Sequence, residues 1–103
     1  MIDGRMVGRI PVGEARRLYA RMIGKAGNMW LGVGRIEKTA EGLEVRWDED
    51  GRAAAPAWEL ATGRWPEGNR EVIEFGVIEQ GRILRIARCR LTGWAVRESR
   101  WGR

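Results

Sequence analysis

Two runs of residues separated by Gln80-Gly81 constrain the fold of this chain more than any other feature. A two-residue turn at Gln80-Gly81 would join Glu71–Glu79 and Arg82–Leu91 as a β-hairpin. Its register pairs Glu79 with Arg82, Val77 with Leu84, Phe75 with Ile86, Ile73 with Arg88 and Glu71 with Arg90. Opposite charges then meet near the ends and apolar side chains meet in the middle, which favours this register. The last third of the chain is therefore predicted to be antiparallel sheet.

Three further segments have the character of strands. Met29–Ile36 carries aromatic and aliphatic residues with alternate glycines, and Leu43–Trp47 alternates apolar with charged residues. Trp94–Arg97 follows a turn at Thr92-Gly93 and would form a third strand beside the hairpin. With the hairpin, these segments predict about five strands in one antiparallel sheet.

Between Pro11 and Gly27 the apolar residues recur at helical spacing. They are Ala15, Leu18, Tyr19, Met22, Ile23 and Ala26. Pro11 suits the start of a helix and Gly27 its end, so the spacing predicts one amphipathic helix whose basic face lies in solvent, on phosphates or on an acidic protein. The predicted fold class is α+β and β-dominated: this helix packed on a twisted antiparallel sheet or small open barrel of about five strands, with extended termini.

The length of 103 residues fits one domain. Residues 1–10 are predicted to be an extended N-terminal arm, residues 11–98 a single globular domain, and residues 99–103 a C-terminal tail too short to fold alone. The sequence has no apolar run of the length that spans a bilayer, and its N-terminus lacks the apolar stretch of a secretory signal. No membrane partner is expected.

Histidine is absent, and Cys89 is the only cysteine. The commonest general base and the commonest metal ligand are therefore both missing, and a Cys–His nucleophile pair cannot form. No pair of carboxylates is singled out for acid–base chemistry. We therefore expect no enzymatic activity, no small-molecule substrate, no cofactor and no metal site.

The net charge is +5 and the chain has six tryptophans. Arginine and tryptophan are the residue types enriched at binding hot spots. The interface candidates are Trp58, Trp65, Trp94, Trp101, Arg88, Arg97 and Arg100. Trp58 and Trp65 lie in a predicted long loop, residues 52–69, where each indole either forms a contact surface or folds back onto the core.

The hairpin and the C-terminal region also carry a dense basic run. Its members are Arg82, Arg85, Arg88, Arg90, Arg97, Arg100 and Arg103. With Trp94 and Trp101 nearby, such a run could bind a single nucleic-acid strand, because bases stack on indoles while guanidinium groups hold phosphates. The predicted hairpin opposes this reading, since it pairs several arginines with glutamates and alternates them between faces.

The segment from Tyr19 to Val77 resembles small structural proteins of tailed bacteriophages, in the tail, neck or baseplate. The shared features are a short helix, an aromatic-apolar strand ending in Gly-x-Gly or Gly-Arg (Met29–Arg35), a tryptophan with acidic neighbours (Trp47–Asp50), and a hairpin from Glu71. Several prolines are usual after the acidic turn, whereas this chain has mostly alanine there. The resemblance implies a virion building block with no catalytic residues.

The expected function is thus a non-enzymatic assembly subunit of a phage virion, made in the host cytoplasm. It would bind other virion proteins and copies of itself through its arms and the tryptophan-containing loop. The alternative is a small basic nucleic-acid-binding protein that uses an arginine and tryptophan surface. A third possibility is a small inhibitor of a host enzyme.

Overall fold

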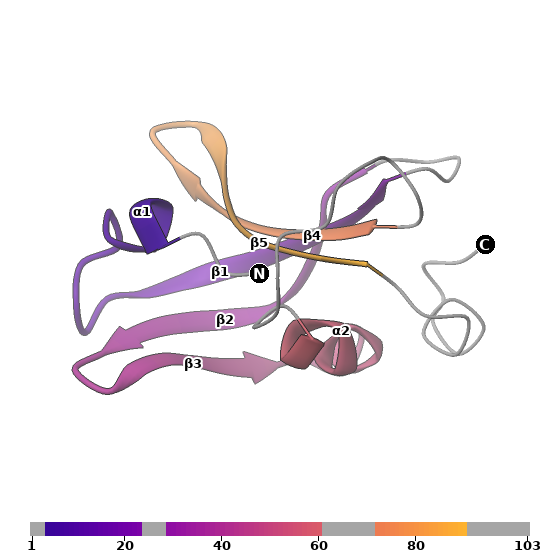
Figure 1. Ribbon diagram of the computed structural model, residues 1–103, viewed down its shortest axis with the longest axis horizontal. Coiled ribbons are helices and arrows are strands. Elements are labelled where there is room, and N and C mark those ends of the chain that lie inside the picture. Colours follow the sequence, from indigo (N-terminus) through magenta and orange to yellow (C-terminus); the bar gives the residue numbers. More distant parts are fainter. Residues whose placement is uncertain (1–3, 24–28, 61–71, 91–103) are drawn as a thin grey trace.

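The computed structural model describes residues 4–23, 29–60 and 72–90. The elements are α1 (Gly4–Val7), β1 (Ala15–Ile23), β2 (Leu31–Thr39), β3 (Gly42–Trp47), the 3-10 helix η1 (Arg52–Ala54), α2 (Ala55–Leu60), β4 (Val72–Glu79) and β5 (Arg82–Arg90). The strands form one antiparallel sheet in the order β3-β2-β1-β4-β5 (Figure 1). The predicted β-dominated fold with about five strands is confirmed, and the sheet is open, with β3 and β5 at its edges.

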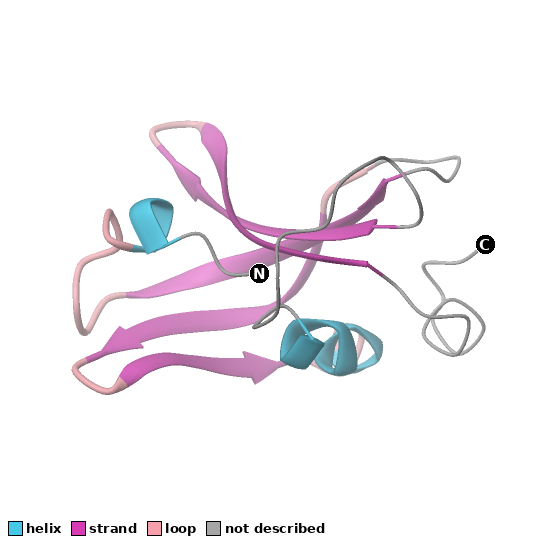
Figure 2. Cartoon of the chain, viewed as in Figure 1, coloured by secondary structure: helices cyan, strands magenta, loops and turns pink. Residues whose placement is uncertain are grey.

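The predicted N-terminal helix is wrong over Ala15–Ile23, which forms the central strand of the sheet. Leu18, Ala20 and Met22 face the core, while the residues between them face the other way. The same apolar residues fit a helical period and a period of two, and pairing with β2 on one side and β4 on the other favours the strand. The helices in the described part of the chain are short, as Figure 2 shows.

The predicted hairpin is present, and its two-residue turn is confirmed. Gln80 and Gly81 have φ angles of 51° and 76°, and positive values at both central residues define the type I′ turn that matches the twist of a hairpin. The predicted register holds from Glu79–Arg82 to Gly76–Arg85. Beyond that pair the register shifts by one residue, so Phe75 opposes Ala87.

This shift is a β-bulge, in which β5 has one residue more than β4 between the pairs Gly76–Arg85 and Phe75–Ala87. The extra residue is Ile86, which is fully buried. The predicted pairs Phe75–Ile86 and Ile73–Arg88 are therefore wrong: Ile73 pairs with Cys89 and Glu74 with Arg88. The bulge moves Arg88 to the face that carries Arg85.

The segment predicted as an extended arm is packed against the sheet from Gly4 onward. Gly4–Val7 forms the helical turn α1, which contacts β5. Ile10 is 2% exposed and belongs to the core. The apolar residues Met6, Val7 and Ile10 explain the packing, because an arm that projected into solvent would leave all three exposed.

The core lies on one face of the sheet, beneath α2. Three aromatic rings from three elements meet there edge to face: Trp47 of β3, Trp58 of α2 and Phe75 of β4, with ring centroids 5.1 to 6.4 Å apart. The segment predicted as a loop from residue 52 therefore begins with η1 and α2 instead. Within the described ranges, no helix is both long and apolar enough to cross a membrane.

Candidate nucleic-acid interface

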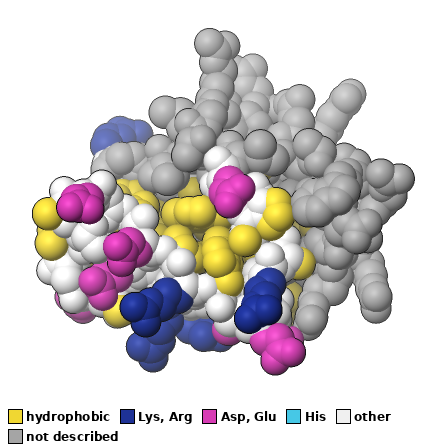
Figure 3. All heavy atoms as spheres, turned by 90° about the horizontal axis from the view of Figure 1, so that it is seen from below, with side chains coloured by type: hydrophobic (Ala, Val, Ile, Leu, Met, Phe, Trp, Pro, Cys, Tyr) yellow, Lys and Arg dark blue, Asp and Glu magenta, His cyan; other side chains and the backbone are white. Residues whose placement is uncertain are grey.

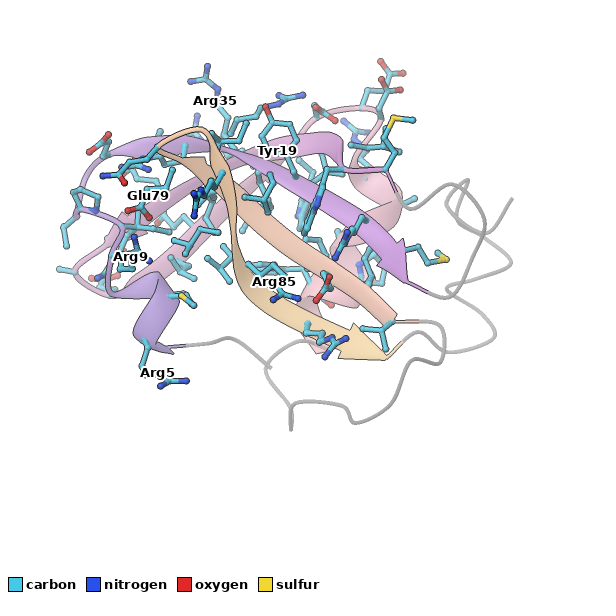
Figure 4. The ribbon with its side chains drawn as sticks, turned by 90° about the horizontal axis from the view of Figure 1, so that it is seen from above. Arg5, Arg9, Tyr19, Arg35, Glu79 and Arg85 are labelled. Carbon is cyan, nitrogen blue, oxygen red and sulfur yellow. The ribbon has the colours of Figure 1, made fainter. Side chains whose placement is uncertain are left out.

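The side of the sheet away from the core is here called the outer face. In β1 it carries Arg17, Tyr19 and Arg21, which alternate with the buried core residues. Residues paired across neighbouring strands lie on the same face, so the registers place further charged side chains beside these three. Figure 4 shows Arg35 and Tyr19 on one side of the sheet, and Arg85 over the ribbon of the β4–β5 hairpin.

Three arginines on the outer face lie directly opposite one another on three neighbouring strands. Arg17 of β1 pairs with Arg35 of β2, and Arg35 pairs with Arg46 of β3. This set is called the basic row. Its arginines are exposed, and with strands about 4.8 Å apart the row spans roughly 10 Å.

Only one member of the basic row has an acidic partner among the described residues. Arg17 Nη2 lies 3.0 Å from Asp48 Oδ2, while Arg35 and Arg46 form no ion pair with any residue the structure describes. Like charges placed directly opposite each other destabilise a sheet. A ligand with negative charge would relieve this repulsion.

An acidic pair lies next to the basic row. Glu37 of β2 pairs with Glu44 of β3, two residues along each strand from Arg35 and Arg46. A shallow hollow of about 210 Å³ lies between the two pairs, lined by Ala15, Arg35, Ile36, Glu37, Glu44 and Arg46. The acidic pair marks one boundary of the basic surface.

A second group of arginines surrounds Glu74 of β4, whose side chain is fully buried. Arg21 Nη2 lies 3.0 Å from Glu74 Oε1, Arg85 Nη1 3.3 Å from Oε2, and Arg88 Nε 3.4 Å from Oε2. One carboxylate therefore faces three guanidinium groups and leaves an excess of positive charge. The side chain of Arg85 is 57% exposed, so part of this charge reaches the solvent.

Aromatic rings lie between the two arginine groups. Tyr19 is flanked by Gly32 on β2 and Gly76 on β4, the residues paired with it on either side. The Arg17 guanidinium lies over Gly32, where a Cβ atom would come within 2.6 Å of it. Trp30 lies close to Gly76, and the Arg21 guanidinium carbon is 4.8 Å from the centre of the Trp30 ring, a cation–π contact.

Of the interface candidates named from the sequence, the structure describes two. Trp58 is half-buried and packs against the core through Trp47 and Phe75, as in the reading in which this indole folds back. Arg88 lies on the outer face, with its side chain 18% exposed against Glu74. Trp65, Trp94, Trp101, Arg97 and Arg100 lie outside the described residues.

The residues that make up the basic row were not named as candidates from the sequence. Arg17 was assigned to a helix, and Arg35 and Arg46 to separate strands of unknown order. The local signal is that each of these arginines precedes an apolar residue in a strand, namely Leu18, Ile36 or Trp47, but the row exists only once the strand registers are known.

Two other places in the described structure hold charged or reactive groups: a cleft at the hairpin turn and Cys89. A cleft of about 510 Å³ at the hairpin turn is lined by Arg9, Glu79, Gln80, Arg82, Ile83 and Leu84, and Arg9 and Glu79 form an ion pair of 2.8 Å across it (Figure 4). Cys89 is 3% exposed, and burial raises the pKa of its thiol above the usual value. Among the described residues, no cluster of His, Cys, Asp or Glu could hold a metal ion.

No protein-family model matches the chain, and neither the curated proteins nor the solved structures contain a match.

Proposed function

We propose that the protein is a non-enzymatic binding protein whose outer face binds single-stranded nucleic acid. The observation that carries the proposal is the basic row, in which Arg17, Arg35 and Arg46 lie abreast on three strands and two of them have no acidic partner among the described residues. Arginine suits this role because its planar guanidinium forms bidentate hydrogen bonds with phosphate.

The aromatic residues favour a single strand over a duplex. Tyr19 and Trp30 lie on the same face as the arginines, and proteins that bind single strands combine a basic surface with rings on which bases stack. The positions beside Tyr19 on both neighbouring strands are glycines, and the Arg17 guanidinium lies over Gly32 while Trp30 lies close to Gly76. A base that stacks on Tyr19 would therefore have a guanidinium and an indole as its neighbours.

An architectural analogy supports the same proposal. In OB-folds, which are five-stranded and partly open barrels, oligonucleotides bind on the face of strands 2 and 3. Here Arg35 and Arg46 lie on β2 and β3 of an open five-stranded sheet. The analogy concerns only the location of the surface, since a fold alone does not determine a function.

The test is fluorescence anisotropy with labelled oligothymidylate and oligouridylate of about 20 nucleotides, longer than the roughly 4–16 nucleotides that one such fold covers. Affinity should fall as salt rises. Each phosphate contact with a single strand contributes about −0.7 to the slope of log K against log salt, so three contacts should give a slope of about −2. A duplex of the same length should bind more weakly, because its bases cannot reach the rings.

The informative variant is Arg35→Gln/Arg46→Gln, which should weaken binding and reduce the magnitude of the salt slope by about 1.4, two contacts' worth. The matched control is Arg52→Gln/Arg82→Gln, which removes two exposed arginines outside the basic row. If both double variants weaken binding equally, net charge and not the basic row is responsible. If the wild-type protein binds neither oligonucleotide at low salt, the proposal fails.

A structural role in a larger assembly is the second candidate function. The open edge of β3 favours it, because an unpaired strand can be extended by another chain. The test is whether the purified protein, freed of nucleic acid, forms a discrete oligomer that persists in high salt.

A further inference from the structure

The edge strand β3 carries backbone groups that the sheet does not use. β3 pairs with β2 on one side and with no described strand on the other. Two hydrogen bonds establish which residues point outward. Asp48 N–H donates to the Val33 carbonyl (3.0 Å), and Gly13 N–H donates to the Lys38 carbonyl (2.7 Å).

The first of these bonds continues the β2–β3 register, so the hydrogen-bonded pairs are those in phase with Val33–Asp48, namely Arg35–Arg46, Glu37–Glu44 and Thr39–Gly42. The second hydrogen bond supports the same assignment, because the Lys38 carbonyl points to Gly13 and not to its register partner Leu43. The N–H and C=O groups of Leu43, Val45 and Trp47 therefore point away from the sheet. None of them takes part in a loop or turn hydrogen bond among the described residues.

The sequence of this edge is complementary to itself when two copies run antiparallel. Pairing centred on Val45 places Val45 opposite Val45 of the second copy and Leu43 opposite Trp47. All three outward-pointing residues then exchange hydrogen bonds with one another. On the outer face the same pairing places Glu44 opposite Arg46, twice, so each carboxylate meets a guanidinium.

Charge excludes the neighbouring registers. The smallest shifts that keep the outward-pointing residues paired move the centre by one residue, to Glu44 or to Arg46. The first would place two glutamates opposite each other, and the second would place two arginines opposite each other, both of which destabilise a pair of strands. Of these three registers, only the one centred on Val45 satisfies hydrogen bonding and charge together.

The apolar side chains of β3 also favour a second strand at this edge. Leu43, Val45 and Trp47 contact the core but stay half-buried, and none of the described strands lies on the outer side of β3. Figure 3 looks at the molecule from below, the side on which β3 lies in Figure 1, and shows hydrophobic side chains open to solvent beside basic and acidic ones. A second copy of β3 would cover part of the remaining surface of these three residues.

We propose that two copies of the chain associate through β3, antiparallel and centred on Val45, to form a continuous sheet of twice five strands around a two-fold axis. Such an interface is isologous: the same residues contribute on both sides. The inference is argued and tested without nucleic acid, and it shares one residue with the nucleic-acid proposal: Arg46 belongs to the basic row and in the dimer also faces Glu44 of the second copy.

The test is the mass of the purified, nuclease-treated protein by sedimentation equilibrium across micromolar to millimolar concentrations. The wild-type protein should approach twice its mass of 11.7 kDa. Glu44→Arg alone and Arg46→Glu alone should each weaken dimerisation at least tenfold, because each places like charges opposite each other twice. The double variant E44R/R46E should dimerise like the wild type, and an equimolar mixture of the two single variants should form a mixed dimer.

Arg35→Glu is the matched control for Arg46→Glu, since it makes the same charge change one strand inward on the same face. It should leave the dimer intact, and circular dichroism of every variant checks that the sheet is folded. A wild-type protein that stays monomeric at all concentrations would overturn the proposal, and Glu44 and Arg46 would then be charges that keep edges apart. A dimer that withstands both single reversals would also overturn it.

Discussion

The carboxylate of Glu74 lies against the guanidinium of Arg21, whose Nε and Nη2 atoms are 3.1 and 3.0 Å from Oε1. Glu74 is fully buried, whereas the side chain of Arg21 is 27% exposed. A buried carboxylate is tolerated only when it is paired, because its transfer from water is costly. Here the pairing links β1, β4 and β5 on the outer face.

Glu74→Gln should lower the free energy of unfolding by about 2 kcal/mol, below the ~3–5 kcal/mol typical of broken buried pairs because the three arginines reach solvent. Urea denaturation measures the loss. Glu49→Gln, which removes an exposed carboxylate outside this cluster, should change stability by less than about 0.5 kcal/mol. Equal stabilities for the two variants would mean that the Glu74 cluster does not stabilise the fold.

Trp58→Ala should destabilise the protein by about 3 kcal/mol, because it leaves a cavity between Trp47 and Phe75. Trp58→Phe keeps a ring in that place and should cost less. Thermal and urea unfolding of both variants provide the comparison. An unchanged stability for Trp58→Ala would mean that the indole does not stabilise the core, and Trp58 would again be a candidate for a surface contact.

Two substitutions in the hairpin turn should change stability in opposite directions. Gln80 has a φ of 51°, a left-handed conformation that asparagine adopts more readily, so Gln80→Asn should raise stability by roughly 0.5 kcal/mol. Gly81 has a φ of 76°, and Gly81→Ala should lower stability by about 1 kcal/mol. The same unfolding curves measure both. Changes of equal sign would argue against the type I′ turn.

Cys89 should react slowly with a thiol reagent in the folded protein, roughly 100-fold more slowly than in denaturant, because reaction requires local opening. Burial raises its pKa, so the folded chain holds the thiol proton more tightly than the unfolded chain. This contribution to stability is complete below the unfolded pKa of about 8.5 and is lost as pH rises above it. Cys89→Ala should remove that part of the alkaline loss, and an identical pH profile would contradict the assignment.

The β4–β5 hairpin could be predicted from the sequence because its information is local. The Gln80-Gly81 turn and the first pairs are correct. The bulge was missed, although the apolar residues of β5 change phase there, from Leu84 and Ile86 to Ala87 and Cys89. Such a change of phase is the local signal of an extra residue in a strand.

The sequence predicts a helix over β1 because Leu18 and Met22, four residues apart, fit a helical period as well as a period of two, and the β4 partner of this strand is remote in sequence. The basic row could not be predicted for the same reason. It requires the order of three strands and two registers, and one misassigned strand removes Arg17 from it. The sequence shows that arginines are present in these strands, but it does not show that three of them lie side by side.

The central position of β1 also has a consequence for how the chain reaches this structure. β1 joins β2 after a short connection, but its pairs with β4 link residues between 49 and 59 positions apart. The β2–β3 and β4–β5 hairpins involve local contacts and can form within about 1–10 μs, whereas joining them through β1 requires closure of a long loop. The pairing of β1 with β4 should therefore be the slowest step of folding. Until these two strands pair, β1 and β4 each present an unpaired edge to any other chain nearby.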